Sequence, residues 1–340
     1  MGRATFILLA LAAGCLMALQ ARINSFVATD LGDSITAGAV VFAAGFVTMA
    51  AVAVLSRGAR RSVQVMWGQL RRRELPRYLL LAGPAGMLGV LAQTMTVQVI
   101  GVALFSLSFI LGQMVASTSI DHFGWSLGMR RRLNIVGGAA LALAMAGVAT
   151  ASVPRLDAAG ASVWAAFAFV FAAGMTVSTH MAFNGRITAA VGRPEPAALA
   201  TYIFGTAAVA LAIAALAAGG LGRLDTLVNV KVWYLALGLV GPVVVLLAAA
   251  VVRRVGVLLF ALGMVTGQLI GSILLDLYWP ATNAAVSWPT LAGAALSLCA
   301  LIVLQRWGQR NDLPVDGGGG RSGNGQPPSP DLEPAPQHPS

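Results

Sequence analysis

The chain has 340 residues, of which 58% are hydrophobic and only 10% are charged, and its mean hydropathy is +0.80. A soluble domain averages roughly 45–50% apolar and about 25% charged residues, because its surface must face water. This composition excludes a soluble globular protein. The net charge of +10 does not indicate nucleic acid as a partner, because the basic residues lie between apolar runs, where they set orientation and contact membrane lipids.

The apolar residues fall in runs of about 18–25 residues, which match a hydrocarbon layer of ~30 Å at a helical rise of ~1.5 Å per residue. In chain order these runs predict ten transmembrane helices near residues 4–22, 35–55, 78–97, 99–120, 133–152, 163–183, 197–218, 232–252, 255–275 and 288–307. The first run resembles a secretory signal, but its Ala12-Ala13-Gly14 recurs inside the chain as Ala172-Ala173-Gly174. We therefore expect an uncleaved first helix.

The basic residues are distributed unequally between the two predicted sides of the membrane. Of the 22 Lys and Arg residues, 18 fall on one side, and four fall on the other: Arg22, Arg155, Arg223 and Lys231. Cytoplasmic loops carry an excess of Lys and Arg. The asymmetry therefore predicts a multi-pass protein of the plasma (inner) membrane with both termini in the cytoplasm.

Two segments outside the predicted spans have patterns of their own. Residues 57–77 place Val63, Met66, Trp67 and Leu70 at spacings of three and four, between arginine clusters. This pattern predicts a short amphipathic helix on the cytoplasmic leaflet. From residue 312 the chain is rich in Gly and Pro and cannot bury enough apolar area to offset the entropy of ordering, so we expect a disordered tail.

The second half of the chain repeats the first. At an offset of 160 residues Asn24 matches Asn184, and the offset later falls to 155. The strongest block aligns residues 101–121 with residues 256–276, where nine of 21 positions are identical. Paired Gly-Gln, Ser and Asp at equal spacing do not arise by chance in sequence rich in Ala, Leu and Val, so the duplication is secure.

Each predicted half has five helices, an odd number, so the second half must insert upside down relative to the first. We therefore predict an all-α membrane protein with ten transmembrane helices as two inverted five-helix repeats, an arrangement widely used by secondary transporters. The predicted units are a first repeat over 1–152, an external linker over 153–162, a second repeat over 163–307 and a disordered cytoplasmic tail over 308–340.

Two polar stripes occupy equivalent positions in the predicted bundle. Their members are spaced at i, i+4 and i+8, which places each stripe on one helix face: Gln113, Ser117 and Asp121 in the first half, and Gln268, Ser272 and Asp276 in the second. Unpaired polar groups are costly in hydrocarbon, so these side chains face partners or a water-filled cavity. The glutamines either line a substrate pathway or hold helices together. For the two aspartates, at helix ends, we expect capping or structural pairing.

Further polar residues lie in the first, third and sixth predicted spans or at their ends: Gln20, Asn24, Gln93, His180 and Asn184. We assign these residues, with the two glutamines and two serines of the stripes, to the substrate pathway. His180 could carry a coupling proton, although a histidine near a helix end is more often a satisfied polar residue. No Asp or Glu lies deep within a predicted span, so a carboxylate-based antiport cycle is not expected.

The leading functional hypothesis is a secondary transporter of a small molecule that works by alternating access between the halves. An intramembrane enzyme acting on lipid-linked substrates would need clustered nucleophiles, metal ligands or carboxylates at membrane depth, and the predicted spans contain none. We therefore expect no catalytic residue, metal or cofactor. A non-transporting membrane scaffold is the other alternative, but it would not require inverted halves. The sequence leaves a homodimer open.

A family resemblance rests on two motifs: an Ala-Gly pair followed by Gln20 and Asn24, and the run from Gly112-Gln113 to Asp121-His122-Phe123-Gly124. These motifs resemble the YdcZ-type family of the drug/metabolite transporter superfamily, whose members typically have five spans. The chain looks like two such units fused over residues 4–307. The resemblance implies a ten-helix transporter fold and export of a small molecule.

Overall fold

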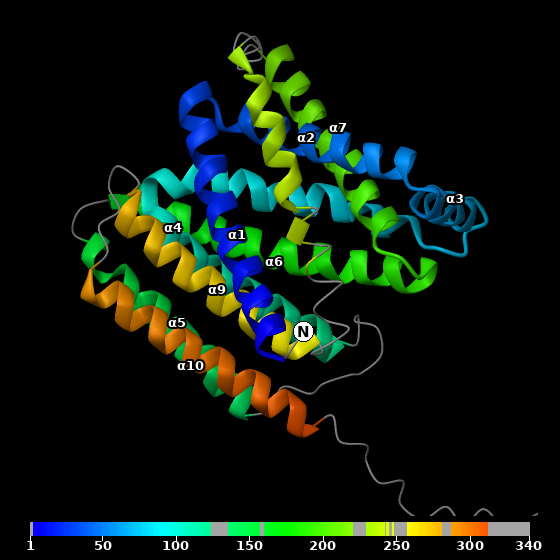
Figure 1. Cartoon of the computed structure of the whole chain (residues 1–340). Coiled ribbons are helices and arrows are strands. Elements are labelled where there is room, and N and C mark those ends of the chain that lie inside the picture. The colour runs from blue at the N-terminus through cyan, green and yellow to red at the C-terminus, as the bar shows by residue number, and fades with distance from the viewer. Residues whose placement is uncertain are drawn as a thin grey trace, which may run out of the picture.

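The computed structural model describes residues 3–123, 135–156, 160–219, 229–241, 243–244, 247, 257–280 and 287–311 (Figure 1). Every element in these ranges is a helix, and in chain order they are α1 Arg3–Leu31, α2 Ser34–Leu55, α3 Arg57–Arg71, η1 Arg77–Leu81, α4 Ala82–Phe123, α5 Ile135–Leu156, α6 Gly160–Val191, α7 Glu195–Ala218, η3 Val232–Leu239, α9 Val257–Tyr278 and α10 Trp288–Asn311.

Helices of membrane-spanning length dominate the described part of the chain. Five stretches are long and apolar enough to cross a bilayer: Ala4–Leu31, Ser34–Leu55, Arg77–Ser117, Ser162–Val191 and Glu195–Ala218. Shorter apolar helices cover Ala142–Ala151, Gly263–Tyr278 and Trp288–Ala300. Every described element is helical, as predicted, and the lengths and composition of these helices are consistent with a membrane protein.

A tight turn joins α1 to α2. Gly32 lies in this turn with a φ of 67°, a conformation that glycine adopts at little cost. The Asp33 carboxylate then accepts a hydrogen bond from the Thr36 backbone N–H at 3.0 Å. This cap satisfies one of the N–H groups that have no partner within the first turn of α2.

The amphipathic helix predicted between the second and third spans is confirmed as α3. Its Met66 and Leu70 are buried in one apolar cluster with Ile187 of α6 and Ala200 of α7. The apolar side that the sequence suggested for lipid contact is therefore covered by the ends of two long helices of the protein itself.

α4 is broken at Gly101, whose φ of 80° and ψ of 166° are not helical. This backbone region is essentially restricted to glycine. The break divides α4 into a first arm, residues 82–100, and a second arm, residues 102–123. Each arm has the length of about 20 residues that a bilayer crossing needs. The predicted third and fourth spans correspond to these arms, the third including η1.

The first arm of α4 runs antiparallel to α6. His180 Nδ1 lies 2.8 Å from the Ala82 carbonyl oxygen. Seven residues further along the arm, Gly89 packs against the side chain of Val177, which comes three residues earlier in α6. The order of contacts along one helix is thus reversed along the other.

The second arm runs parallel to α6. Near its start Ser108 Oγ donates to the Phe167 carbonyl oxygen at 3.2 Å. Near its end Ile120 lines a pocket with Thr179, so both contacts advance together along the two helices. Because α6 is antiparallel to one arm and parallel to the other, the chain reverses direction at Gly101.

The two halves contact each other through equivalent helix pairs, α1 with α9 and α6 with the second arm of α4. A methyl group added at Gly14 of α1 would overlap the Met264 carbonyl of α9, and one added at Gly174 of α6 would overlap the Phe109 carbonyl of the second arm. Gly174 follows Gly14 by 160 residues, and Met264 follows Phe109 by 155. These are the offsets of the sequence repeat.

The reciprocal contacts obey the same offsets. Gly267 of α9 meets the Leu11 carbonyl of α1, and Gly112 of the second arm meets the Phe171 carbonyl of α6. Small residues let two helix backbones approach closely, which is how helices associate in lipid. Each half therefore uses the same glycines of the repeat to hold the other half.

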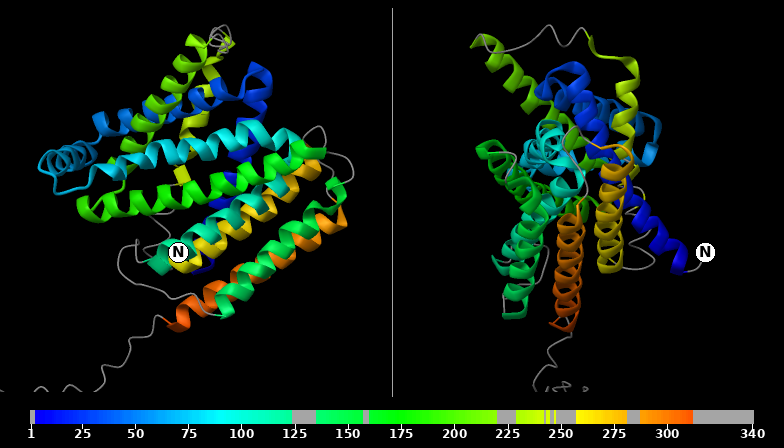
Figure 2. Two further views of the ribbon diagram at one scale, coloured as in Figure 1. Left: turned by 180° about the vertical axis from the view of Figure 1, so that it is seen from behind. Right: turned by 90° about the vertical axis from the view of Figure 1, so that its left-hand side faces the viewer.

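α5 and α10 form a separate pair at one edge of the molecule (Figures 1 and 2). A methyl group added at Gly147 would come within 2.7 Å of the Gly293 carbonyl oxygen. α10 continues to Asn311, four residues beyond its predicted end at 307. The predicted tail from residue 312 lies outside the described residues, as does most of the predicted eighth span beyond residue 241.

Candidate functional site

Two of the predicted pathway residues meet in the first half. Asn24 of α1 is fully buried, and its Nδ2 donates to Gln93 Oε1 of the first arm of α4 at 2.6 Å. The Asn24 Oδ1 atom is also buried and has no hydrogen-bond partner among the described residues. A buried unpaired acceptor is costly, so this oxygen is a place where a water molecule or a ligand donor would be stabilised.

The other pathway residues that meet form a chain from the first arm of α4 through α6 to α7. His180 Nδ1 donates to the Ala82 carbonyl at 2.8 Å, because a carbonyl oxygen can only accept. The other ring nitrogen then accepts from Asn184 Nδ2 at 3.2 Å, and Thr201 Oγ1 of α7 donates to Asn184 Oδ1 at 3.1 Å. Gly86 makes room for the ring, since an added methyl group would lie 2.9 Å from Nδ1.

The two polar stripes lie on different helix pairs. The backbone of Gln113 packs against Gly174 of α6, and the backbone of Gln268 packs against Gly14 of α1. Gln268 is buried, whereas Gln113 is half-buried. Gln20 of α1 is half-buried as well. The structure therefore leaves Gln20 and Gln113 more accessible than Gln268.

The serines of the stripes bond within their own helices. Ser117 is exposed, and its Oγ donates to the Met114 carbonyl at 3.1 Å. Ser272 is fully buried, and its Oγ donates to the Leu269 carbonyl at 2.8 Å. Equivalent serines thus make the same local bond in environments of different exposure.

Asp276 caps a helix of the opposite half. Its side chain is 5% exposed, and its two carboxylate oxygens accept hydrogen bonds from Val102 N–H at 2.9 Å and Ala103 N–H at 2.7 Å. These are the first residues after the break at Gly101, where the second arm of α4 presents unpaired N–H groups and a positive helix end. Asp121, the equivalent residue, lies near the end of α4, and its side chain is outside the described part.

Arg22, whose place in the sequence indicated only membrane orientation, is a buried residue. It is 4% exposed. Its Nε and one Nη donate to the carbonyls of Trp279 and Pro280, each at 3.1 Å, and its guanidinium carbon lies 4.9 Å from the centre of the Trp279 ring. A cation is stabilised at the negative end of α9 and over an aromatic face. The signal in the sequence was an arginine on the poorly charged side, beside Asn24.

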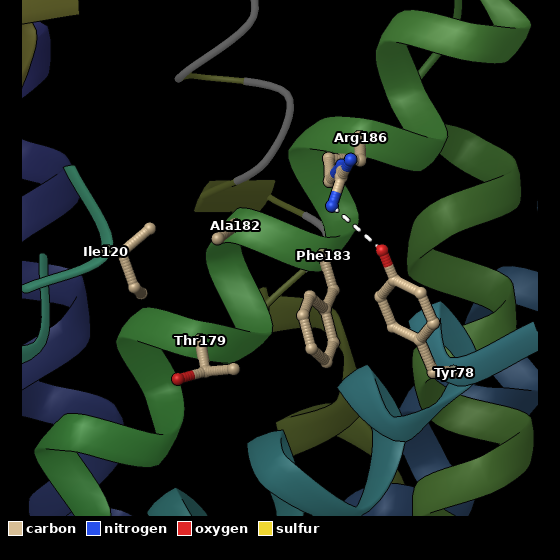
Figure 3. A pocket seen from close by; sticks show the side chains of 6 residues that line it. All are labelled: Tyr78, Ile120, Thr179, Ala182, Phe183 and Arg186. Atoms are coloured by element: carbon tan, nitrogen blue, oxygen red, sulfur yellow. Dashed lines mark hydrogen bonds between the residues drawn. The ribbon is translucent and has the colours of Figure 1, made fainter. Parts of the chain in front are cut away.

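The structure also contains a pocket of about 280 Å³ that the sequence did not predict (Figure 3). It lies between η1, the end of the second arm of α4 and α6, and it is lined by Tyr78, Ile120, Thr179, Ala182, Phe183 and Arg186. Arg186 donates to the Tyr78 hydroxyl at 2.9 Å, and the rings of Tyr78 and Phe183 meet edge to face with centroids 5.6 Å apart. The walls are mainly apolar, and Arg186 and Tyr78 lie together, apart from the hydroxyl of Thr179.

The long apolar helices and their close glycine contacts define an α-helical integral membrane protein. The chain belongs to the family described as "Putative inner membrane exporter, YdcZ", whose model matches residues 5–150 and again residues 165–303. The two matches cover more than four fifths of the chain, so it contains two units of this family in succession. Neither a curated protein nor a solved structure matched the chain.

Proposed function

We propose that the protein is a secondary transporter that exports a small molecule across the inner membrane by alternating access between two inverted five-helix repeats. The observation that carries this proposal is the pairing of α1 with α9, and of α6 with the second arm of α4, through glycines at equivalent positions. In such a design, exchanging the conformations of the halves turns a cavity open to one side into one open to the other. The family description supports export.

The directions of the helices support the inversion. α1 runs parallel to α9, since its contacts advance in order from Gly14 against Gln268 to Arg22 against Trp279. The start of the second arm bonds to Asp276 near the end of α9, which indicates that the second arm and α9 are antiparallel. Because the second arm is parallel to α6, α1 and α6 point in opposite directions, as the first helices of inverted halves must.

The proposed topology has ten spans, with the two arms of α4 as the third and fourth and with η3 at the start of the eighth. Both termini lie in the cytoplasm in this topology, because it places 18 of the 22 basic residues on that side. Lipid and a small-molecule substrate are then the partners of the protein.

The proposed path runs between the halves along their polar residues: Gln20, Asn24, Gln93, Gln113, Ser117, His180, Asn184, Gln268 and Ser272. The half-buried Gln20 and Gln113 suit an accessible section of the path. The buried Asn24, Gln93, Gln268 and Ser272 suit the section that is closed in this state. Membership of an exporter family supports this function over an intramembrane enzyme or a scaffold.

Labelling of single cysteines tests the inverted topology. Cys15 and Cys299 are first replaced by serine, and four exposed positions then receive a cysteine one at a time: Thr29, Arg61, Ala189 and Gly219. We expect a membrane-impermeant maleimide to label intact spheroplasts at Thr29→Cys and Gly219→Cys only. Permeabilised cells serve as the control for reactivity. Labelling of all four positions, or of the two positions within one half to equal extent, would contradict the inversion.

Transport by reconstituted protein tests the path. Proteoliposomes are assayed with a panel of metabolites and cations, first with the native chain and then with Gln113→Ala and Gln268→Ala. Loss of transport in variants that elute as folded protein supports a path along the two glutamines. Normal transport by both variants would contradict this path and would indicate that the glutamines hold helices together.

A further inference from the structure

The pocket beside Tyr78 lies where α6, the first helix of the second repeat, carries the residues equivalent to Arg22 and Ile23 of α1. Ala182 follows Arg22 by 160 residues, and the same offset relates Phe183 to Ile23. On the facing helix, Ile120 precedes Leu275 by the offset of 155 residues. Three of the six lining residues therefore match Arg22, its neighbour Ile23 and Leu275 of the facing helix.

The side chains at the equivalent positions 22 and 182 differ greatly in size. In the first repeat the long Arg22 side chain is 4% exposed and reaches the last carbonyls beyond α9. In the second repeat a methyl group replaces it at Ala182, and about 280 Å³ is left between the walls. Ligand sites usually measure about 300–1,000 Å³, so this volume suits a small ligand.

The polar groups around the pocket favour a negatively charged ligand. Of the six lining residues that the structure describes, Arg186 alone is charged. Its guanidinium donates to the Tyr78 hydroxyl, so this oxygen is an acceptor toward Arg186 and can donate its own hydrogen to a ligand. A carboxylate at this side would accept from both groups, and bonds between charged partners are the strong ones.

Three of the four remaining lining residues suit an apolar body, and the fourth, Thr179, donates its hydroxyl to the Met175 carbonyl of its own helix at 3.3 Å. Phe183, Ile120 and Ala182 offer no hydrogen-bonding side chain, and Figure 3 shows Phe183 beside Tyr78 with Arg186 above them. In the proposed topology this pocket lies at the arginine-rich cytoplasmic side, where the surrounding potential favours an anion. We infer that the pocket binds a small organic anion with an apolar body, with the anionic group at Arg186 and Tyr78 and the body against Phe183 and Ile120.

This inference deepens the proposed export function and rests on it for the assignment of the pocket as the loading site. The anion is taken to be a soluble molecule rather than a lipid headgroup, because the volume is below the usual range for ligand sites. Filling the space from inside the protein, as Arg22 does in the other half, should abolish binding.

Binding by the purified full chain in phosphatidylcholine nanodiscs tests the inference with three probes that share one apolar body: 3-phenylpropionate, 3-phenylpropanol and 3-phenylpropylammonium. We expect equilibrium dialysis to show the anion bound at least about tenfold more tightly than the alcohol, as for a charged hydrogen bond. The ammonium should bind most weakly. Equal or tighter binding of the ammonium, or no binding of any probe, would overturn the assignment.

Three variants locate the site. Arg186→Gln should reduce the affinity for the anion by roughly tenfold or more, with the alcohol unchanged within about twofold. Ala182→Arg should abolish binding of all probes, whereas the control Ala189→Arg, which adds the same charge at an exposed position of α6, should bind normally. Normal anion binding by Ala182→Arg or by Arg186→Gln would place the site elsewhere.

Two further measurements distinguish a soluble anion from a lipid headgroup, and binding from transport. Adding phosphatidylglycerol to the nanodiscs should leave the affinity for 3-phenylpropionate unchanged, and competition by this anionic lipid would overturn the soluble source. Binding is measured without any gradient, so its outcome is independent of transport. Specific binding without transport in proteoliposomes would sink the exporter proposal and leave the pocket standing.

Discussion

In the first repeat an arginine at position 22 fills the space beside the end of α9, whereas in the second repeat an alanine at the equivalent position 182 leaves a pocket. The backbones around both places are held by the same glycines at the same offsets. The comparison teaches that the duplicated scaffold has kept the residues that bring helices together, while the side chains between the helices have diverged.

The two equivalent asparagines show the same division. Asn24 reaches across to Gln93 of another helix, whereas Asn184 bonds to His180 on its own helix and to Thr201 of α7. The position is preserved and its partners differ. The following predictions test how far the halves remain equivalent in energy.

The largest effect is expected for Asp276→Ala. This change removes two charge-assisted bonds to buried N–H groups. It also removes a negative charge that favours the buried Arg22 cation. Breaking such a buried arrangement costs about 3–5 kcal/mol. Denaturant titration in detergent measures the free energy of unfolding. Asp276→Asn, which keeps one acceptor, should lose less, and an unchanged stability in Asp276→Ala would show that the cap is dispensable.

The next effect is expected at the equivalent glycines. Gly14→Ala and Gly174→Ala each force a methyl group onto a carbonyl of the facing helix, and we expect a loss of roughly 3 kcal/mol or more, at the upper end for overpacking. Gly68→Ala is the control, because an added methyl group there meets nothing within 4 Å. It should be neutral or stabilising by up to about 1 kcal/mol. A large loss at only one of the two glycines would break the equivalence.

A smaller loss is expected for Asn24→Ala, which leaves the buried Gln93 without its donor. The cost should be about 1–2 kcal/mol, the penalty for a buried polar group without a partner. Double-mutant cycles with Gln93→Leu isolate the contribution of the pair. Additive losses in the cycle would mean that the hydrogen bond adds no stability.

The smallest loss is expected for Thr201→Val, which removes one bond to Asn184 and keeps a side chain of similar shape. Asn184 keeps its bond to His180, so the loss should be about 1 kcal/mol or less. The same titration measures it. A loss as large as that of Asn24→Ala would show that the chain through His180 is more rigid than its partially buried setting indicates.

The sequence predicted the helices well because apolar runs of bilayer length have few alternative interpretations. It separated the third and fourth spans by one residue, near 98, and the structure places the break at Gly101. It also found the glycines and glutamines that recur in both halves. These signals are local or periodic, so they can be read from a single chain.

The contacts between distant residues could not be read in that way. Asp276 was expected to cap or pair, but its position did not indicate its partners Val102 and Ala103, which are more than 170 positions away. Arg22 and Trp279 are 257 positions apart. The pocket lies beside the short side chain of Ala182, whose equivalent in the first repeat is the long Arg22. This difference in size is recognised only when the repeat alignment is combined with the packing.

The covalent joining of the two units has a consequence for the difference between Arg22 and Ala182. A symmetric pair of identical subunits must carry the same residue at both related positions. A substitution that fills the space at one position therefore fills it at the other as well. In a single polypeptide the two positions are encoded separately. Every molecule then has an arginine at one of the two positions and an alanine at the other, and two different subunits do not have to assemble to give this combination.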